Sequence, residues 1–318
     1  MSHEVETMAY AGEVPWHGLG TPVSNDLTPN QMMVKAGLDW SVNKVPTYAK
    51  VGDTEVETGQ EALIRSSDNK VLTQVGKGWY PVQNEEAFEF FSEYCLEGSM
   101  EMHTASSLKG GEMVWGLAKV KGTFEAVKGD PVEQFFLFSN PHEYGKAIDI
   151  RFTTIRVVCN NTLSMALASV KNTGVRLSHR QMFDANMVKE HMGIADEKFA
   201  QYKEVAQYLA SKNFTADALI QYYNEVFPRT YQGKEEVIVK GFDDLTSNGQ
   251  KAYEFLETQP GAEFGKGTWW QALNSVTYLT DHEMGRETDS RLASAWFGAN
   301  QTRKIKAVEK AVEYAEAA

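Results

Sequence analysis

The hydrophobic pattern of the chain is clearest around residues 148–152, where apolar and polar side chains alternate with the period of a half-buried strand. Beyond Thr153–Thr154 the apolar positions shift from even to odd numbers, along the stretch from Ile155 to Cys159. A β-bulge at the two threonines would restore a single buried face. It would also place Arg151 and Arg156 together on the polar face.

The pattern next changes to a helical period. Asn160 and Asn161 are residues that tolerate left-handed backbone and cap helices. The apolar residues after them recur at helical spacing, at Leu163, Ala166, Leu167 and Val170. The stretch from Ala147 to Val170 is therefore predicted to be strand, turn and helix. A core strand feeding a core helix, with both arginines in solvent, is the simpler alternative.

Upstream of this stretch the chain alternates between strand and helix patterns. Residues 1–42 are predicted to be a loop or arm with one short helix, 25–37. A hairpin is expected around the turn at 66–69, and a helix capped by Asn84 should end before Gly98. Further strands are predicted near 100–106, 113–121 and 133–138.

After Arg180 only helical periods remain. Helices are predicted near 199–209, 216–226, 235–258 with a break at Gly249, 269–279 and 303–317. We therefore predict an α+β fold: an antiparallel or mixed sheet with packed helices, followed by an all-helical C-terminal region. The expected domains are 1–182 and 183–318, with essentially all strands between 44 and 160.

Composition indicates a globular protein. The 318 residues are 42% hydrophobic and 11% aromatic, which is ample for a packed core. No apolar run is long enough for a membrane span, and the N-terminus lacks the features of a signal peptide, so we expect a cytosolic protein. Cys95 and Cys159 both lie in apolar segments and are predicted to be buried thiols.

Charge is unevenly distributed. The net charge of −12 disfavours a general nucleic-acid binder, because phosphate binding needs a basic footprint. Residues 105–180, however, contain six Lys and four Arg against six acidic residues. A positive groove on an acidic body would give this distribution, and so would ordinary scatter.

Motifs for catalysis are missing from the sequence. The seven histidines form no H-E-x-x-H pattern, and no serine lies in a G-x-S-x-G elbow. Glu143 and Asp149 could form a nuclease pair, yet Arg151 is the expected salt-bridge partner of Asp149, and His142-Glu143 indicates a turn. We predict no catalytic residue, no metal and no cofactor, with a nuclease as a weaker alternative.

Basic side chains interleaved with aromatic ones are better represented. Proteins that bind single strands combine a positive track for phosphates with ring faces for bases. The candidate DNA-binding residues are Lys77, Trp79, Tyr80, Lys119, Lys121, Lys146, Arg151, Arg156, Asn160, Asn161, Arg176 and Arg180. Scattered surface lysines and core aromatics are the alternative interpretation.

Four blocks of sequence also resemble a known family. They are PWHGLGTPV at 15–23, GWYPVQNEEAFEFF at 78–91, IRVVCNNTLSMAL at 155–167 and GTWWQALNSVTYLTDH at 267–282, followed by RLASAWFG at 291–298. The chain resembles the phage/plasmid-like proteins of domain of unknown function 932. The resemblance implies a mobile-element protein in a bacterial host cytosol. Its sheet followed by helices is similar in outline to RecT-type single-strand annealing proteins.

These observations give two expectations for function. The first is a non-enzymatic phage protein that binds single-stranded DNA and promotes annealing in recombination, as a homo-oligomeric ring or filament. The second is a phage-encoded protein that binds a host protein through an acidic helical surface. The C-terminal region carries more apolar side chains than a short helical bundle needs, among them Trp269, Trp270 and Trp296. We expect some of them to pack against the sheet domain or against another subunit.

Overall fold

The structure, a computed structural model, describes residues 5–12, 18–96, 98–156, 161–164, 174–180, 195–229, 239–285 and 288–317. Its fold is the predicted α+β class, with a mixed sheet, packed helices and further helices at the C-terminal end. Contacts divide the chain into unit 1 (1–121, 135–151 and 174–194) and unit 2 (122–134, 152–173 and 195–318). The predicted boundary at 182/183 falls outside the described residues and stays a prediction.

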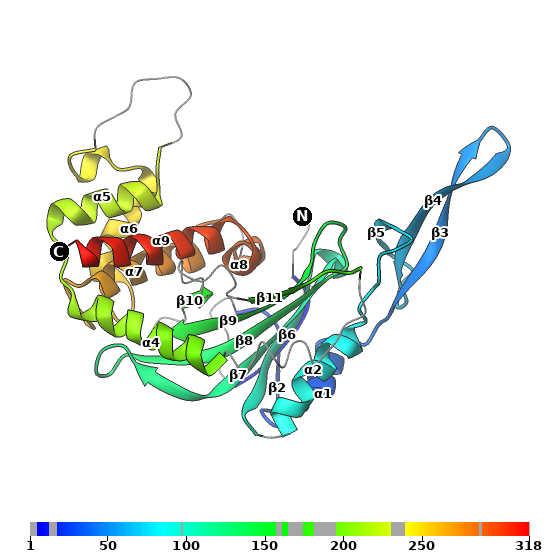
Figure 1. Cartoon of the computed structure of the whole chain (residues 1–318), viewed down its shortest axis with the longest axis horizontal. Coiled ribbons are helices and arrows are strands. Elements are labelled where there is room, and N and C mark those ends of the chain that lie inside the picture. The colour runs from blue at the N-terminus through cyan, green and yellow to red at the C-terminus, as the bar shows by residue number, and fades with distance from the viewer. Residues whose placement is uncertain are drawn as a thin grey trace. The chain divides into compact units, whose positions relative to one another are not determined.

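The larger sheet has the strand order β10-β9-β8-β7-β6-β1-β2, with β11 also paired to β9 (Figure 1). Its strands are β1 (Val5–Ala11), β2 (Thr21–Val23), β6 (Met100–Leu108), β7 (Met113–Glu125), β8 (Pro131–Pro141), β9 (Ile148–Arg156), β10 (Asn161–Ser164) and β11 (Gly174–Leu177). β1 pairs with β2 in parallel and with β6 in antiparallel orientation, so the sheet is mixed. The three strands predicted between residues 100 and 138 are confirmed.

A second sheet contains β3 (Val42–Val51), β4 (Thr54–Arg65) and β5 (Val71–Gly76) in that order. The predicted hairpin is the β4–β5 pair, and β3 extends it. The prediction that essentially all strands lie between 44 and 160 was wrong, because β1 and β2 precede this range and β10 and β11 follow it. β1 becomes a strand because it pairs with β6 and buries Met8 and Tyr10, which short sequence windows do not reveal.

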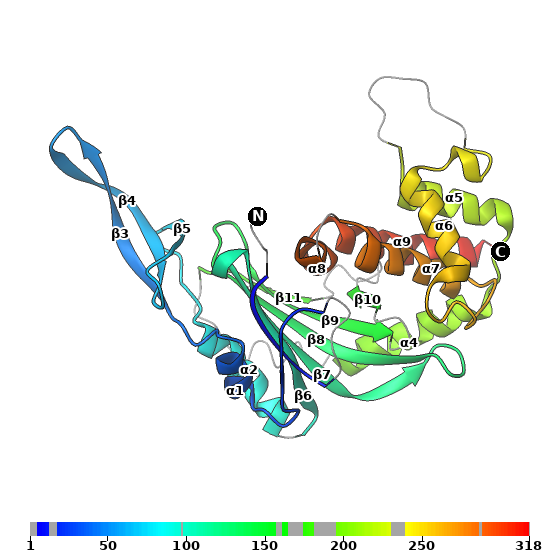
Figure 2. The same cartoon turned by 180° about the vertical axis from the view of Figure 1, so that it is seen from behind.

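Two helices of unit 1 contact each other, α1 (Pro29–Lys35) and α2 (Asn84–Leu96), as Figure 2 shows. α1 lies within the predicted helix 25–37 and begins with a capping box between Thr28 and Gln31. α2 buries Phe88 and Phe91 as predicted. The side chain of Asn84 does not cap α2, because its oxygen lies 3.0 Å from His142 Nε2 and its amide nitrogen donates to the carbonyls of Leu38 and Trp40.

The helix predicted after β9 is corrected by the structure. Residues 161–164 form β10, which pairs antiparallel with β9, from Asn161 opposite Arg156 to Ser164 opposite Thr153. This ladder has no register shift, so the predicted bulge at Thr153–Thr154 is not part of it. Pairing supplies main-chain hydrogen bonds that outweigh the local helical pattern. The remaining residues of the predicted helix, 165–170, lie outside the described residues.

Unit 2 is mainly helical. Its described helices are α4 (Ala195–Ser211), α5 (Ala216–Val226), α6 (Ser247–Thr258), α7 (Trp269–Tyr278), α8 (Thr288–Phe297) and α9 (Ala299–Glu316). α4, α5, α7 and α9 correspond to predicted helices, whereas α8 was not predicted. α6 begins only at Ser247, so Gly249 lies in its first turn and does not break it. In the described part, no helix is long and apolar enough to cross a membrane.

The core of unit 2 contains its tryptophans and one buried ion pair. Trp269, Trp270 and Trp296 are buried within this chain, so they no longer require a second subunit to cover them. Trp270 Nε1 donates to Asp130 in the turn after β7, at 2.8 Å. Lys304 of α9 lies 2.7 Å from Asp281, which belongs to a π-helical turn, Leu279–Glu283.

Candidate nucleic-acid interface

Three segments of unit 1 that are distant in sequence meet at His179. The Nδ1 atom of His179 lies 3.0 Å from the carbonyl oxygen of Tyr80, and the ring also faces the backbone of Pro141. The backbone N–H of Tyr80 donates to the carbonyl of His179 at 2.5 Å. The ring of Trp79 stacks on His179 with 4.0 Å between the centroids. We call this meeting point of segments 77–84, 139–147 and 174–180 the His179 junction.

The loop between Trp79 and α2 belongs to no strand. Side chains of segment 139–147 hold it in place. Asn140 Nδ2 donates to the carbonyl of Val82 at 2.9 Å. His142 Nε2 lies 3.0 Å from Asn84 Oδ1. Because the amide nitrogen of Asn84 already donates to two carbonyls, Nε2 of His142 must carry the proton. Side-chain hydrogen bonds therefore hold the backbone of this loop, whereas the backbone of a sheet is held by hydrogen bonds between strands.

Both histidines of the junction are held neutral. Burial lowers the pKa of His142 to about 3, and burial also lowers the pKa of His179. His142 Nδ1 and His179 Nε2 are buried without hydrogen-bond partners. In the part of the chain that the structure describes, no three acidic, histidine or cysteine side chains are placed to hold a metal ion. The histidines thus position the segments and contribute no positive charge.

The positively charged side chains lie on the surface around the junction. Tyr144 and Lys146 are exposed in the loop after β8, where Gly145 adopts a φ of 82° that favours glycine. Arg176 on β11 and Arg180, next to His179, are exposed as well. Among the described residues, no carboxylate lies within ion-pair distance of Lys146 or Arg180. We call Tyr144, Lys146, Arg176 and Arg180 the cationic rim.

Strand pairing and the His179 junction bring the residues of the cationic rim close together. Arg176 pairs in register with Asp149, three residues after Lys146. Arg180 follows His179, whose ring faces the backbone of Pro141 just before the loop of Tyr144. The ring of Tyr144 is 67% exposed, so its face is accessible. The rim therefore combines an aromatic face with cations in one part of unit 1.

The predicted aromatic residues of loop 77–80 have a different role from the one expected. Trp79 is only 9% exposed beneath His179, and its ring is not free to stack on a base. The Tyr80 hydroxyl donates to Glu86 at 3.3 Å, and the nearby carboxylate raises the Tyr80 pKa. Lys77 is exposed but pairs with Glu57 at 3.0 Å. These three residues therefore contribute to the structure of the junction and its surroundings.

The arginines of β9 are not shown to form a shared track. Arg151 is ion-paired with Asp149, and its side chain is 12% exposed. Arg176 Nε lies 3.8 Å from the same carboxylate. Arg156 and Asn161 occupy strand positions whose side chains are not described, and Asn160 lies outside the described residues. The DNA-binding roles of these residues stay predictions.

Lys119 and Lys121 lie away from the His179 junction. Lys119 is opposite Glu101 in the β6–β7 ladder, and the N–H of Lys121 donates to Ser99. The junction is instead near the start of β7, because the N–H of His142 donates to Glu112. Lys119 and Lys121 therefore do not belong to the junction, and their DNA-binding roles stay predictions.

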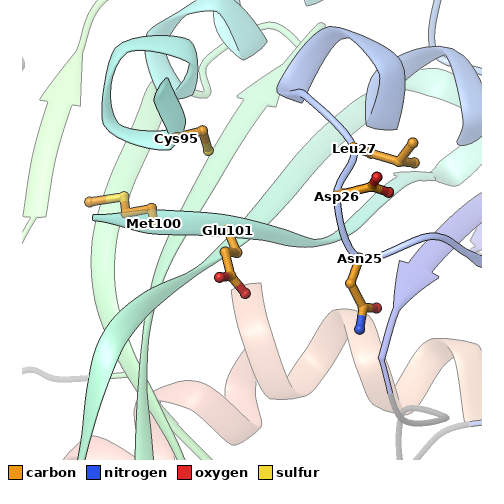
Figure 3. Close-up of a pocket in the computed structure, with 6 residues that line it drawn as sticks. All are labelled: Asn25, Asp26, Leu27, Cys95, Met100 and Glu101. Atoms are coloured by element: carbon orange, nitrogen blue, oxygen red, sulfur yellow. The ribbon is translucent and has the colours of Figure 1, made fainter. Parts of the chain in front are cut away.

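A pocket of about 290 Å³ lies beside Glu101 (Figure 3). It is lined by Asn25, Asp26, Leu27, Cys95, Met100 and Glu101. Burial raises the pKa of the Cys95 thiol to about 11, so the thiol stays protonated at neutral pH and is a poor nucleophile. The two carboxylates disfavour a phosphate ligand. This pocket is therefore not part of the candidate interface.

Sequence reasoning missed Tyr144. The sequence pattern predicts a turn at His142-Glu143 and indicates no role for the tyrosine directly after it. Its signal was a tyrosine followed by Gly145 and Lys146, which is an aromatic ring and a cation around a turn glycine.

Comparison with known proteins places the chain in a family. The family model described as "Domain of unknown function (DUF932)" matches residues 71–306. The chain belongs to this family. The match includes all segments of the His179 junction in this DUF932 protein. No curated protein and no solved structure matches the chain. The similarity in outline to RecT-type annealing proteins stays a prediction.

Proposed function

We propose that this DUF932 protein binds single-stranded DNA without enzymatic activity and promotes annealing during phage recombination in the bacterial host cytosol. The observation that carries the proposal is the cationic rim, which combines the exposed ring of Tyr144 with two exposed cations, Lys146 and Arg180, that lack carboxylate partners in the described chain. Base stacking on an aromatic ring tolerates any sequence, and cations hold the phosphates. Binding of this kind leaves the pairing edges of the bases free for a complementary strand.

The contacts of the cationic rim with phosphates, and not the net charge of −12, should make binding weaken as salt rises. Repulsion between DNA and the acidic body acts over about 10 Å at 0.1 M salt, whereas contacts at the rim act at close range. Each phosphate contact releases counterions, so affinity should fall as salt rises, with a slope that counts the contacts. Non-specific binding at low salt is the property to measure first.

The test replaces one cation at a time by glutamine. Lys146→Gln, Arg176→Gln and Arg180→Gln should each weaken binding of oligo-dT, and each should reduce the salt slope by roughly 0.7. Lys251→Gln in α6 is the matched control, because it removes an exposed cation outside the rim. Fluorescence anisotropy at several salt concentrations measures both quantities, and circular dichroism confirms folding.

Arg151→Gln separates the rim from the track expected on β9. Arg151 is already neutralised by Asp149 and mostly covered, so we expect a smaller change in slope than for Arg180→Gln. An unchanged affinity in all three rim variants would contradict the proposal. A wild-type protein that binds no oligo-dT at low salt would instead favour the alternative, a protein that binds a host protein.

A further inference from the structure

The outer part of the β3–β4 hairpin is exposed, and in the described chain an ion pair joins its Glu57 to Lys77. We define the ribbon tip as residues 48–57, in which Tyr48 pairs with Glu57 and Val51 pairs with Thr54. All its residues are exposed, and β5 pairs only with residues 60–64 of β4. A register shift after Pro46 separates the tip from the base of the hairpin. The tip is thus a two-stranded ribbon that extends beyond α1 and α2 in Figures 1 and 2.

The two faces of the ribbon tip differ in polarity. Because paired residues share a face, Ala49 with Val56 and Val51 with Thr54 form one uncharged face. The other face carries Tyr48, Lys50, Glu55 and Glu57. Val51 is 66% exposed and Val56 is 49% exposed, so the apolar face is bare.

A bare two-stranded ribbon is marginal in water, and it becomes stable when more strands join it. An open edge beside an apolar face is a ready template for strand pairing. We propose that the β3 edge of the ribbon tip pairs antiparallel with the same edge of a second copy of this chain, with Ala49 on the two-fold axis. This contact goes beyond the proposed DNA binding and does not depend on it.

The hydrogen-bonding pattern selects the residues that can pair. Val51 and Thr54 close a two-residue loop, Gly52-Asp53, so they form a hydrogen-bonded pair within the hairpin. Main-chain groups alternate in direction along a strand, and therefore those of Tyr48 and Lys50 point outward from β3. With Ala49 on the axis, Tyr48 of one copy and Lys50 of the other exchange hydrogen bonds.

Charge and backbone chemistry favour this register over its neighbours. A shift in one direction places Lys50 opposite Lys50 of the second copy, where like charges repel. A shift in the other direction places Lys50 opposite Pro46, which has no N–H to donate. With Ala49 on the axis, the Lys50 ammonium instead lies beside the ring of Tyr48, an attractive contact.

The opposite edge of the ribbon tip is unsuited to the same pairing. On β4 the equivalent arrangement, centred on Val56, places Glu55 opposite Glu57 of the second copy. Two such repulsions would occur in each dimer, because a two-fold contact repeats every interaction. The β3 edge is therefore self-complementary and the β4 edge is not. Pairing through β3 gives a four-stranded sheet in which the two apolar faces join.

A cysteine cross-link tests the contact and its register. In a non-hydrogen-bonded antiparallel pair the two Cα atoms are about 4.5 Å apart, within the range of a disulfide. Ala49→Cys in the full chain should therefore form a covalent dimer when treated with oxidised glutathione. Val56→Cys is the matched control on the same face but on the other strand, and it should stay monomeric on a non-reducing gel. Equal cross-linking of both variants, or of neither, would overturn the proposal.

A pair of opposite charge changes tests the same contact without covalent chemistry. Tyr48→Lys faces Lys50 of the second copy with a like charge, and should weaken dimerisation by roughly tenfold. Tyr48→Glu faces it with an opposite charge, and should strengthen dimerisation by a similar factor. Sedimentation equilibrium without DNA measures both dissociation constants, and thermal melting checks folding. A wild-type chain that is strictly monomeric, or variants that change in the same direction, would reject the contact.

Discussion

At the residue scale, Tyr144 is the side chain on which the proposed DNA binding most depends. Its ring is exposed, and the loop that carries it is anchored by Pro141 and His142 in the His179 junction. An anchored ring loses little conformational entropy when a base stacks on it. It is therefore a more effective platform than a side chain in a free loop.

We predict that Tyr144→Ala weakens binding of oligo-dT by about 1–3 kcal/mol, the value of one stacked base. Tyr144→Phe keeps the ring and should bind like the wild type, which makes it the matched control. Fluorescence anisotropy at one low salt concentration measures the difference. Equal loss in both variants would indicate that the hydroxyl, and not the ring face, matters.

The buried histidine of the junction predicts a pH dependence of stability. Burial lowers the pKa of His142 to about 3 in the folded protein, whereas in the unfolded chain it titrates near 6.5. The unfolded chain therefore takes up the proton first as the pH falls. The stabilising contribution is complete above about pH 6.5 and is lost progressively toward pH 3.

Between pH 7 and pH 5, this group should lower the free energy of unfolding by about 2 kcal/mol. Burial lowers the pKa of His179 too, so that residue adds to the effect in the same direction. Urea unfolding at both pH values measures the change. His142→Gln should show a smaller difference between the two pH values, and an identical difference would exclude His142 as its source.

At the scale of elements, the contact of α2 with β7 depends on a glycine. A Cβ atom at Gly116 would lie 3.2 Å from the ring of Phe88, closer than such contacts normally are. The strand can therefore accept the helix only where no side chain intervenes. The same helix begins at Asn84, where the loop of the His179 junction ends, so this contact also supports the site.

We predict that Gly116→Ala destabilises the protein by about 1–3 kcal/mol through overpacking against α2. Gly76→Ala at the end of β5 is the control, because a Cβ there meets nothing within 4 Å. It should change stability by less than about 0.5 kcal/mol. Urea unfolding monitored by circular dichroism compares the stabilities of the two variants. Similar losses of stability in both would show that the lost backbone freedom of glycine, and not packing against α2, causes the effect.

At the scale of the whole molecule, dimerisation through the ribbon tip would link two cationic rims. A strand that reaches both rims binds the second one at a high effective concentration. A strand that reaches only one rim gains nothing from the dimer. Assembly and DNA binding would thus be coupled through the length of the DNA.

We predict that Tyr48→Lys weakens binding of long oligo-dT by roughly tenfold or more, while binding of short oligo-dT is unchanged. The measurement is an anisotropy titration with a series of lengths. Tyr48→Glu should show the opposite trend at low protein concentration. An equal effect on all lengths would mean that Tyr48 contacts DNA directly.

The sequence by itself determined the fold class and most elements. Glycine-containing turns separated the strand candidates that became β6, β7 and β8, and helical periods marked α2, α4, α5 and α7. Family membership also followed from the order of its motifs. These features are local in sequence, so short windows contain the information.

Only the tertiary structure decided the rest. β1 and β10 are strands because partners distant in sequence or across a turn accept their hydrogen bonds, against weak or contrary local patterns. Trp79 was expected to be a stacking platform, but it packs beneath His179, a residue 100 positions later. Tyr144 joined the interface through the same long-range contacts. A local pattern shows which face of an element is apolar, while burial and proximity depend on which other segments fold against it.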